Sequence, residues 1–231
     1  TSAPGDISTV AFDGGDGTEA NPYVIMNDQQ LQAMNNDLGA HYILGQNIDA
    51  SGTTSWNGGD GFDPIGEGQF PEFTGSLDGD GYVVDGLHIN RPSENEVGLI
   101  GANNGDVSNI GVVNADVTGG DYSVGGLVGL NHDGTVTESY STASVSGADS
   151  VGGLVGYNDG GTLSDSYATG DVSGTDNYVG GLVGFNTGTV SESYATGEVS
   201  GDVFSIGGLV GYNTDTVSNS YWDVDSSGQS S

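Results

Sequence analysis

The sequence contains no cysteine and no lysine, and its only arginine is Arg91. Without cysteine there is no disulfide framework, and the redox compartment cannot be read from the chain. Against this single arginine stand 32 acidic residues, which give a formal net charge of -31. So acidic a chain offers no basic patch for nucleic acid or for an anionic membrane surface. We therefore expect no nucleic-acid partner.

Proline and long apolar runs are also scarce. All five prolines lie at or before Pro92, so every later strand can donate ladder hydrogen bonds on both sides. No apolar run reaches the length of about 18 residues that a membrane helix needs, which argues against direct membrane insertion. The chain begins at Thr1 without a methionine or an apolar leader. We expect a soluble portion of a longer protein.

What the sequence does contain is a repeat. VGGLVG-type segments begin at Val124, Val151, Val179 and Ile206, and a looser copy, VGLIGANN, begins at Val97. The starts lie 27, 27, 28 and 27 residues apart, and each segment is followed by a Gly/Asn turn, a TVxxSYATG-type segment and a short VSG. Such a fixed period indicates an array of identical supersecondary units.

The repeat predicts an all-β fold. Its few apolar residues are β-branched or aromatic and are bounded by glycine, which favours short strands over helices. A period near 27 residues fits one coil of a parallel β-helix, with roughly three strands per coil and coils about 4.8 Å apart. Equivalent residues should then stack into columns. The predicted aromatic column is Tyr140, Tyr167, Tyr194 and Tyr221, and the predicted amide column, at a turn, is Asn131, Asn158, Asn186 and Asn213.

The first part of the chain has a different pattern. Residues 1–10 read as a linker or a first strand, 41–52 as a strand, 53–70 as a long loop and 73–90 as further strands. One short helix is predicted at about 28–38, where Asn27 can cap it and Gln30 completes a capping box. Its apolar stripe is Leu31, Met34 and Leu38. We expect this helix to close the N-terminal end of the solenoid and to shield its first edge.

The order of these segments resembles a known family. GGDGTEANPYVI, DQQLQAM, HYILGQNIDASG, DPIG and FTGSLDGDGYVVDGLHIN precede the repeated VGGLVGYNxGTVSxSYATGxVSG and a closing NSYWD. This succession, from about Asp13 to Asp223, is similar to the GLUG-repeat region of bacterial and archaeal secreted surface proteins. The resemblance implies a right-handed parallel β-helix in an adhesin-like or matrix protein at the cell surface. The family offers no agreed catalytic residues, and its protease regions have no counterpart here.

With this resemblance, we interpret residues 1–231 as a single β-helix domain. Residues 1–96 would form the N-terminal cap and first coils, 97–223 the GLUG-type repeats and 224–231 a polar tail.

Calcium is the one cofactor that the sequence raises. Paired aspartates in Gly-rich loops can bind calcium through oxygen ligands. The three candidate pairs are Asp13/Asp16, Asp60/Asp63 and Asp78/Asp80. None fits an EF-hand loop or the nonapeptide calcium repeat, and turn chemistry alone also accounts for Asp-Gly. The three histidines lack metal-ligand spacing.

Two kinds of site compete in the repeats. Glu138, Asp165 and Glu192 stack in register, and paired carboxylates can hydrolyse glycosidic bonds. However, a catalytic site usually breaks a repeat at one place. Lyases that act on acidic sugars also need cationic side chains, and this chain has only Arg91. The tyrosine column is the second candidate, as a sugar-stacking platform if its rings face outward. Strict alternation would put Val190, Glu192 and Tyr194 on one face. Either a bulge intervenes or the tyrosines lie outside.

The function favoured by these patterns is a non-enzymatic, extracellular structural or adhesive module. A carbohydrate-binding module is the alternative, and a β-helix glycoside hydrolase or lyase is third. Expected partners are cell-surface or matrix components, glycans, or copies of the chain itself. The charge favours a halophilic source because the Debye length falls to about 3 Å at 1 M salt. An acidic, calcium-loaded surface protein is the other explanation of the charge.

Overall fold

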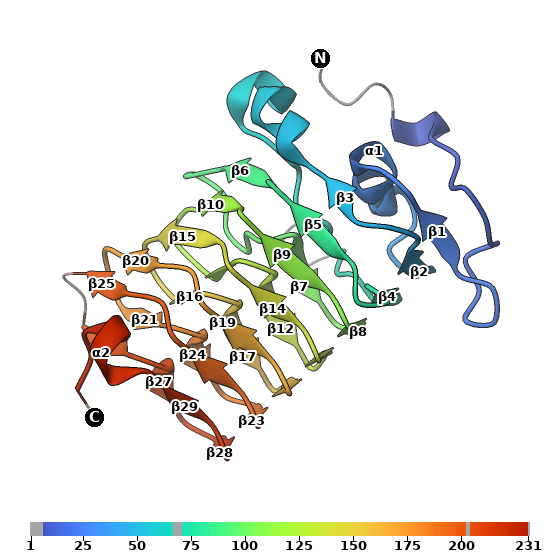
Figure 1. Cartoon of the computed structure of the whole chain (residues 1–231). Helices are drawn as coiled ribbons and strands as arrows, with labels where there is room; N and C mark the ends of the chain where they lie inside the picture. The colour runs from blue at the N-terminus through green and yellow to red at the C-terminus, as the bar shows by residue number, and fades with distance from the viewer. Residues whose placement is uncertain (1–6, 67–70, 202–203, 231) are drawn as a thin grey trace.

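The computed structural model describes residues 7–66, 71–201 and 204–230, and in it the chain forms a parallel β-solenoid (Figure 1). Every pairing between its named strands is parallel, and the strands align in five sheets along the solenoid axis. Tyr167 pairs with Tyr194 in the adjacent coil, and Val151 pairs with Val179. The predicted parallel β-helix and its repeat register are confirmed.

We name each sheet after a residue type that recurs in it. The threonine sheet contains β1 (Tyr23–Ile25), β2 (His41–Leu44), β4 (Ser76–Asp78), β8 (Asp106–Ser108), β13 (Thr135–Thr137), β18 (Thr162–Ser164), β23 (Thr189–Ser191) and β28 (Thr216–Ser218). The tyrosine sheet contains β3 (Ile48–Asp49), β5 (Val83–Asp85), β9 (Gly111–Val113), β14 (Tyr140–Ser141), β19 (Tyr167–Ala168), β24 (Tyr194–Ala195) and β29 (Tyr221–Trp222).

Three smaller sheets complete each coil. The serine sheet contains β6 (His88–Asn90), β10 (Asp116–Thr118), β15 (Ser144–Gly147), β20 (Val172–Gly174) and β25 (Val199–Gly201). The glycine sheet contains β11 (Val124–Gly125), β16 (Val151–Gly152), β21 (Tyr178–Gly180) and β26 (Ser205–Gly207). The asparagine sheet contains β7 (Ile100–Asn103), β12 (Val128–His132), β17 (Val155–Asp159), β22 (Val183–Asn186) and β27 (Val210–Asn213).

Each repeat coil therefore has five short strands, and the prediction of roughly three was wrong. Sharp corners divide what the sequence suggested were longer strands. At the corner between the glycine and asparagine sheets, a Cβ added to Gly152 would collide with the carbonyl oxygen of Val155. Only glycine permits so close a backbone approach.

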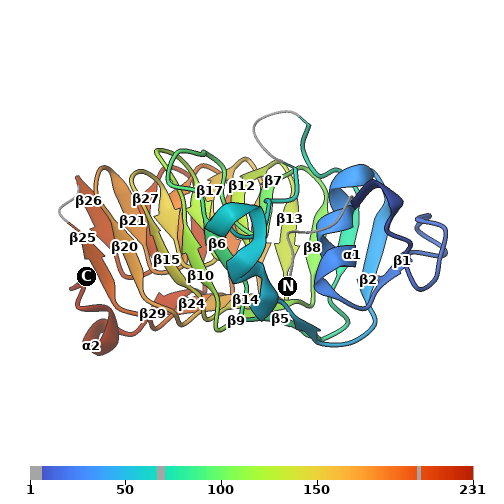
Figure 2. The ribbon, with the colours of Figure 1, turned by 90° about the horizontal axis from the view of Figure 1, so that it is seen from above.

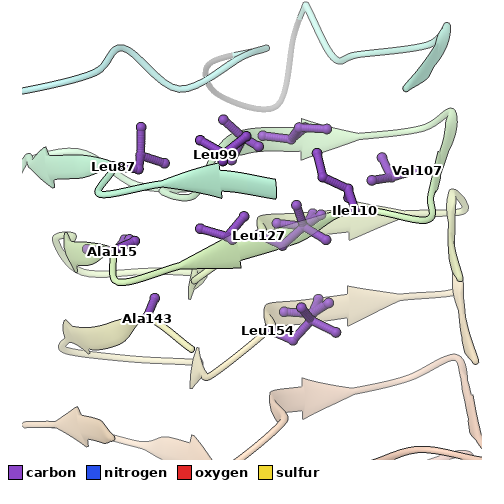
Figure 3. Packing of buried hydrophobic residues seen from close by; sticks show 14 of the residues in the cluster. Leu87, Leu99, Val107, Ile110, Ala115, Leu127, Ala143 and Leu154 are labelled. Carbon is purple, nitrogen blue, oxygen red and sulfur yellow. The ribbon is translucent and has the colours of Figure 1, made fainter. Parts of the chain in front are cut away.

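The core is a set of apolar columns inside the coils. In the threonine sheet the central residue of each repeat strand points inward, and Val136, Leu163 and Val190 are fully buried. A second column contains Leu99, Leu127 and Leu154, which lie one above another in successive coils (Figure 3). Full burial of each such side chain stabilises the fold by about 1.5 to 3 kcal/mol. The core therefore grows with every coil.

A short helix covers the N-terminal end of the solenoid, beside β1 and β2 (Figure 2). α1 (Asp28–Gln32) continues as the 3-10 helix η2 (Ala33–Asn36), so the regular helix is shorter than the predicted 28–38. Asn27 caps α1 by accepting from the Gln30 N–H, as predicted, while the Gln30 side chain accepts from the Met26 N–H. Leu31 and Met34 are fully buried in the core.

The rest of the N-terminal region differs from the prediction in detail. The predicted strand at 41–52 is split into β2 and β3, and the predicted loop at 53–70 begins inside the 3-10 segment η3 (Ser51–Gly59), which buries Trp56. Residues 67–70 lie outside the described residues. η1 (Ile7–Thr9) stands where a linker or strand was predicted, and α2 (Val224–Ser227) lies in the polar tail.

We expect Leu31→Asp to lower the free energy of unfolding by about 2 to 4 kcal/mol, because it places a charge without a partner in the core. The matched control is Gln29→Asp, on the exposed side of the same helix, which should have little effect. Thermal melts of both variants measure the difference. If Leu31→Asp melts like the parent chain, the helix is dispensable as a cap.

Candidate functional site

The predicted tyrosine column exists and runs along the outside of the tyrosine sheet. Ring centroids of Tyr140 and Tyr167 lie 4.7 Å apart, those of Tyr167 and Tyr194 4.9 Å, and those of Tyr194 and Tyr221 5.5 Å. Neighbouring rings are within 7° of parallel. Burial, together with the flanking tyrosines, raises the pKa of Tyr167.

The same stacking limits how this column can bind a sugar. Each inner ring is covered on both faces by its neighbours, so its edge and hydroxyl face the solvent. A sugar that stacks on an aromatic ring needs a free ring face. Tyr221, which is 62% exposed, ends the column. The geometry therefore favours cohesion between coils along the column and leaves a free ring face at its C-terminal end.

The outward direction of the tyrosines follows from a corner residue in each repeat. β23 ends at Ser191, Glu192 adopts a left-handed conformation with φ 50°, and β24 starts at Tyr194. This turn breaks the strict alternation, so Val190 points inward, Glu192 is exposed and Tyr194 is half-buried. Both alternatives from the sequence therefore hold: an irregularity breaks the alternation, and the tyrosines lie outside. The same corner is left-handed at Asn109, Glu138, Asp165 and Asn219.

We expect Glu192→Asn to raise the free energy of unfolding by about 0.5 to 1 kcal/mol, because asparagine tolerates the left-handed conformation better than glutamate does. The substitution also removes one charge from the row of Glu138 and Asp165. Glu192→Gln is the control, since it removes the charge without relieving the backbone. Calorimetric melts at high salt separate the two effects, and equal Tm values for both variants would show that backbone strain contributes nothing.

The predicted amide column is buried inside the asparagine sheet. The Nδ2 of each asparagine donates to the Oδ1 of the equivalent residue in the next coil, at 2.8 Å from Asn131 to Asn158 and from Asn158 to Asn186. The second N–H of Asn158 donates to the carbonyl of Gly161 in its own turn, at 3.0 Å. The ladder begins one coil earlier than predicted, at Asn103, and ends at the exposed Asn213. It fixes the register of successive coils.

A second aromatic cluster was missed in the sequence. Tyr157 and Phe185 stack with centroids 4.7 Å apart, and Tyr178 lies 5.0 Å from Tyr212 and 5.2 Å from Phe185. The signal was present, because the residue between glycine and asparagine in VGGLVGxN is aromatic in three coils. Tyr178 comes from the glycine sheet and carries no such signal.

A polar groove of about 260 Å³ lies over the serine sheet. Its carboxylates are Asp116, Asp171 and Glu198, and its hydroxyls belong to Ser144, Ser146, Ser173 and Ser200. Asp171 and Glu198 occupy the same repeat position in successive coils, and the Glu198 N–H donates to the Asp171 Oδ1 at 3.1 Å. Hydroxyls and a carboxylate also line a neighbouring cavity, at Thr118, Asp121, Ser146 and Thr175.

The groove does not have the arrangement of a serine hydrolase. His88 Nδ1 lies 3.8 Å from Asp116 Oδ2 at one end, and Asp116 is paired in register with Ser144. The carboxylate thus stands between the histidine and the serine, which are two coils, or about 10 Å, apart. A nucleophilic serine needs its base within hydrogen-bond reach.

The six aspartates of the predicted calcium pairs do not converge. Asp13 accepts from Gln30, Asp16 from Thr18, Asp63 contacts Arg91 at 3.0 Å, and Asp78 accepts from the Asp80 N–H. For Asp60 the structure shows no comparable side-chain contact. Across the described ranges there is no group of three or more histidine, cysteine, aspartate or glutamate side chains that could hold a metal ion. Calcium binding at these pairs stays a prediction.

A buried acid–histidine pair ties the N-terminal loop to the repeats. His132 Nδ1 lies 2.8 Å from Glu72 Oε1, and the Glu72 side chain is only 5% exposed. The hydrogen bond to Glu72 is the main cause of a raised pKa for His132. The two residues are 60 positions apart, so no local pattern could have revealed the pair.

The raised pKa of His132 makes stability depend on pH. A raised pKa in the folded state means that the protonated pair stabilises the fold fully below the unfolded value near 6.5, and that this stabilisation is lost as the pH rises through the folded pKa. We expect the Tm to fall between about pH 6 and pH 8. His132→Gln should flatten that part of the profile. An unchanged slope in this variant would assign the effect to other groups.

Residues 120–146, 147–173 and 175–200 match the GLUG motif. Three successive repeats of this chain therefore match the GLUG motif. Each match begins at or just after the end of one serine-sheet strand and ends in the serine-sheet strand of the next coil, so one GLUG motif corresponds to one coil.

The chain is similar to two curated proteins over more than half of its length. It is 39% identical over 142 residues to Halomucin from Haloquadratum walsbyi and 37% identical over 134 residues to a provisionally named Gly-rich membrane protein from Evansella cellulosilytica. The matched part covers 2% of the first protein and 15% of the second. The chain therefore corresponds to a small part of each relative.

One solved structure shares the fold. A provisionally named immunoglobulin A1 protease from Bacteroides ovatus superposes with a TM-score of 0.61 at 25% identity, over 95% of this chain and 80% of that one. This match agrees with the β-solenoid fold of the chain. None of the helices in the described part of the chain is both long and apolar enough to span a membrane.

Proposed function

We propose that this chain is a non-catalytic structural and adhesive module of an extracellular surface, suited to high salt. The observation that carries the proposal is the unbroken register between coils, held by the buried asparagine ladder and the stacked tyrosines. Such a solenoid grows linearly and keeps its ends at a fixed separation, which suits a spacer. The relatives named Halomucin and Gly-rich membrane protein support an extracellular location.

The arrangement of the corner carboxylates and of the groove over the serine sheet supports the same role. The carboxylates at the left-handed corner repeat in three coils without a break, and the histidine of the serine sheet cannot reach a serine. The charge of -31 supports a halophilic source, because screening at molar salt removes most of the self-repulsion.

Antibodies raised against the repeat coils test the location. We expect them to label intact cells of the source organism and to lose this label after mild protease treatment of the cell surface. Incubation of the chain with polysaccharides and with casein at high salt should release no product. Labelling only after lysis would contradict the proposal, and turnover would contradict its non-catalytic part.

A carbohydrate-binding module is the second candidate, and the groove over the serine sheet favours it. Carboxylates and hydroxyls can hydrogen-bond to sugar hydroxyls, and the groove extends over several coils. Calorimetry with neutral oligosaccharides at high salt tests this function. Ser173→Lys should abolish binding there, while Thr189→Lys on the threonine sheet should not.

A further inference from the structure

The last coil has an open edge that the inner coils lack. Residues 212–219, from the end of β27 through β28, are all exposed. In the preceding coil the equivalent residues are buried or half-buried as far as Ser191. Val217 is 37% exposed, whereas Val190, its neighbour in register, is fully buried. We call residues 212–219 the open edge.

The C-terminal tail covers other parts of this end and leaves the open edge free. α2 and the residues after it fold back beside β25 and β29 (Figure 1). Gln229 donates to the carbonyl of Val199 at 2.8 Å and accepts from the Trp222 indole at 3.3 Å. Within the described residues, β28 and β27 are the last strands of their sheets.

The backbone of β28 is prepared to pair with a further strand. Thr216 N donates to Gly188 O, and Ser218 O accepts from Glu192 N, so both residues point their backbone groups to the preceding coil. Because the direction alternates along a strand, the N–H and C=O of Val217 point outward. The amide ladder ends in the same place, where Asn213 bonds its own turn at Asp215 instead of a next asparagine.

The open edge lacks the lysine and proline that often prevent strand pairing, and its one charged residue is Asp215. Exposed edges are normally blunted by lysine, proline, bulges or a covering segment. Residues 212–219 include no lysine and no proline. Their chemistry is that of the inner coils, whose equivalent surfaces are each covered by the next coil. The coil-to-coil interface of the solenoid therefore continues to this edge.

The opposite end cannot supply the missing partner. There the backbone of Val24 in β1 exchanges hydrogen bonds with Asp13 and Gly14, at 3.2 and 3.0 Å. α1 also packs over this end, with Leu31 in the core. Head-to-tail stacking of two copies would have to displace these segments. A second copy can meet the open edge only with its own open edge, which gives a closed two-fold contact.

We propose that the open edge is a self-association surface through which two copies join tail to tail, with β28 of one copy antiparallel to β28 of the other. In this dimer Val217 is covered by the partner's Val217, as Val190 is covered within the chain. The inference deepens the proposed adhesive function by naming its partner as a second copy of this chain. Because each copy carries -31 charges, association requires salt of about 1 M or more.

Analytical ultracentrifugation of the chain in about 0.05 to 3 M KCl tests the proposal. We expect a monomer at low salt and a dimer at high salt. Val217→Asp should remain monomeric at high salt, and Thr162→Asp, an exposed position in an inner coil of the same sheet, should dimerise like the parent chain. A parent chain that stays monomeric at every salt concentration, or that forms open-ended polymers, would overturn the proposal.

Cross-linking keeps the test independent of any loss of stability in Val217→Asp. The chain has no cysteine, so Val217→Cys introduces a single thiol. Opposed Cα atoms in an antiparallel pair lie about 4.5 to 5.5 Å apart, within disulfide range. Diamide accepts the two protons and two electrons that two thiols lose on forming the disulfide. Val217→Cys should yield a covalent dimer at high salt, and Thr162→Cys should not.

The outcomes separate this inference from the proposed function. Labelling of intact cells together with a monomer at all salt concentrations would retain the surface location and reject self-association. A salt-dependent dimer together with antibody labelling only after cell lysis would retain self-association and reject the surface location. Equal cross-linking of both cysteine variants would show random collision and would reject the proposed interface.

Discussion

Replacing Asn158 by alanine is expected to cost about 2 to 6 kcal/mol of stability. The variant removes the hydrogen bonds that Asn158 makes to Asn186 and Gly161. It also leaves one of the two N–H groups of the Asn131 Nδ2 without its acceptor and removes the amide donor of the Asn186 Oδ1, both in a fully buried position, although the bonds of these atoms to Gly134 and Gly188 remain. Each buried polar group left without a partner costs about 1 to 3 kcal/mol.

The same ladder supplies the control. Asn213 is exposed and ends the ladder. Water can therefore replace the hydrogen bonds that Asn213→Ala removes, and this variant should lower the free energy of unfolding far less than Asn158→Ala. Calorimetric melts should show a fall in Tm of roughly 2 to 4 °C per kcal/mol for Asn158→Ala. Similar Tm values for the two variants would mean that the ladder contributes no more inside the solenoid than at its end.

The stacking of residues could be predicted from the sequence because it depends only on the period. Once successive coils align, residues 27 or 28 positions apart must be neighbours along the axis. The Tyr167–Tyr194 contact and the Asn131–Asn158 contact follow from this rule alone. Nothing about the cross-section of the coil was needed for either prediction.

The cross-section itself could not be predicted from the same pattern. The number of strands per coil depends on where the backbone turns, and glutamate or aspartate at a left-handed corner gives a weak signal, since these positions favour glycine and asparagine. Asn109 and Asn219 occupy the equivalent corner and were the available clue. Similarly, an apolar stripe that extends to Leu38 cannot distinguish an α-helix from one that tightens into a 3-10 turn after Gln32.

The polar contacts outside the repeat could not be predicted from the sequence for another reason. Glu72 meets His132, and Asp63 meets Arg91, across 60 and 28 positions of the chain. Such pairs depend on how the N-terminal loop lies against the coils. Glu72 and Asp63, which the loop contributes, belong to no periodic pattern. The open edge was hidden for the same reason, because its exposure depends on how far the tail folds back.

The largest dependence of this protein on its surroundings should be on salt. Glu138, Asp165 and Glu192 share one row at a corner, and Asp171 and Glu198 share another over the serine sheet. Coils about 4.8 Å apart bring successive carboxylates in a row close together. At 5 Å each pair of like charges repels by about 0.8 kcal/mol even at the dielectric constant of water. The three neighbouring pairs together are comparable with a sizeable part of a domain's net stability.

We therefore expect the Tm to rise by at least about 5 to 10 °C between 0.05 and 3 M KCl, at roughly 2 to 4 °C per kcal/mol. Melts in the presence of a chelator distinguish the cause. If general screening acts, the chelator changes nothing at any salt concentration. If a divalent ion occupies the Asp-Gly loops or the carboxylate rows, the chelator lowers the Tm even at high salt, and added calcium restores it. A Tm that is flat across the whole range would exclude charge repulsion as a controlling force in this fold.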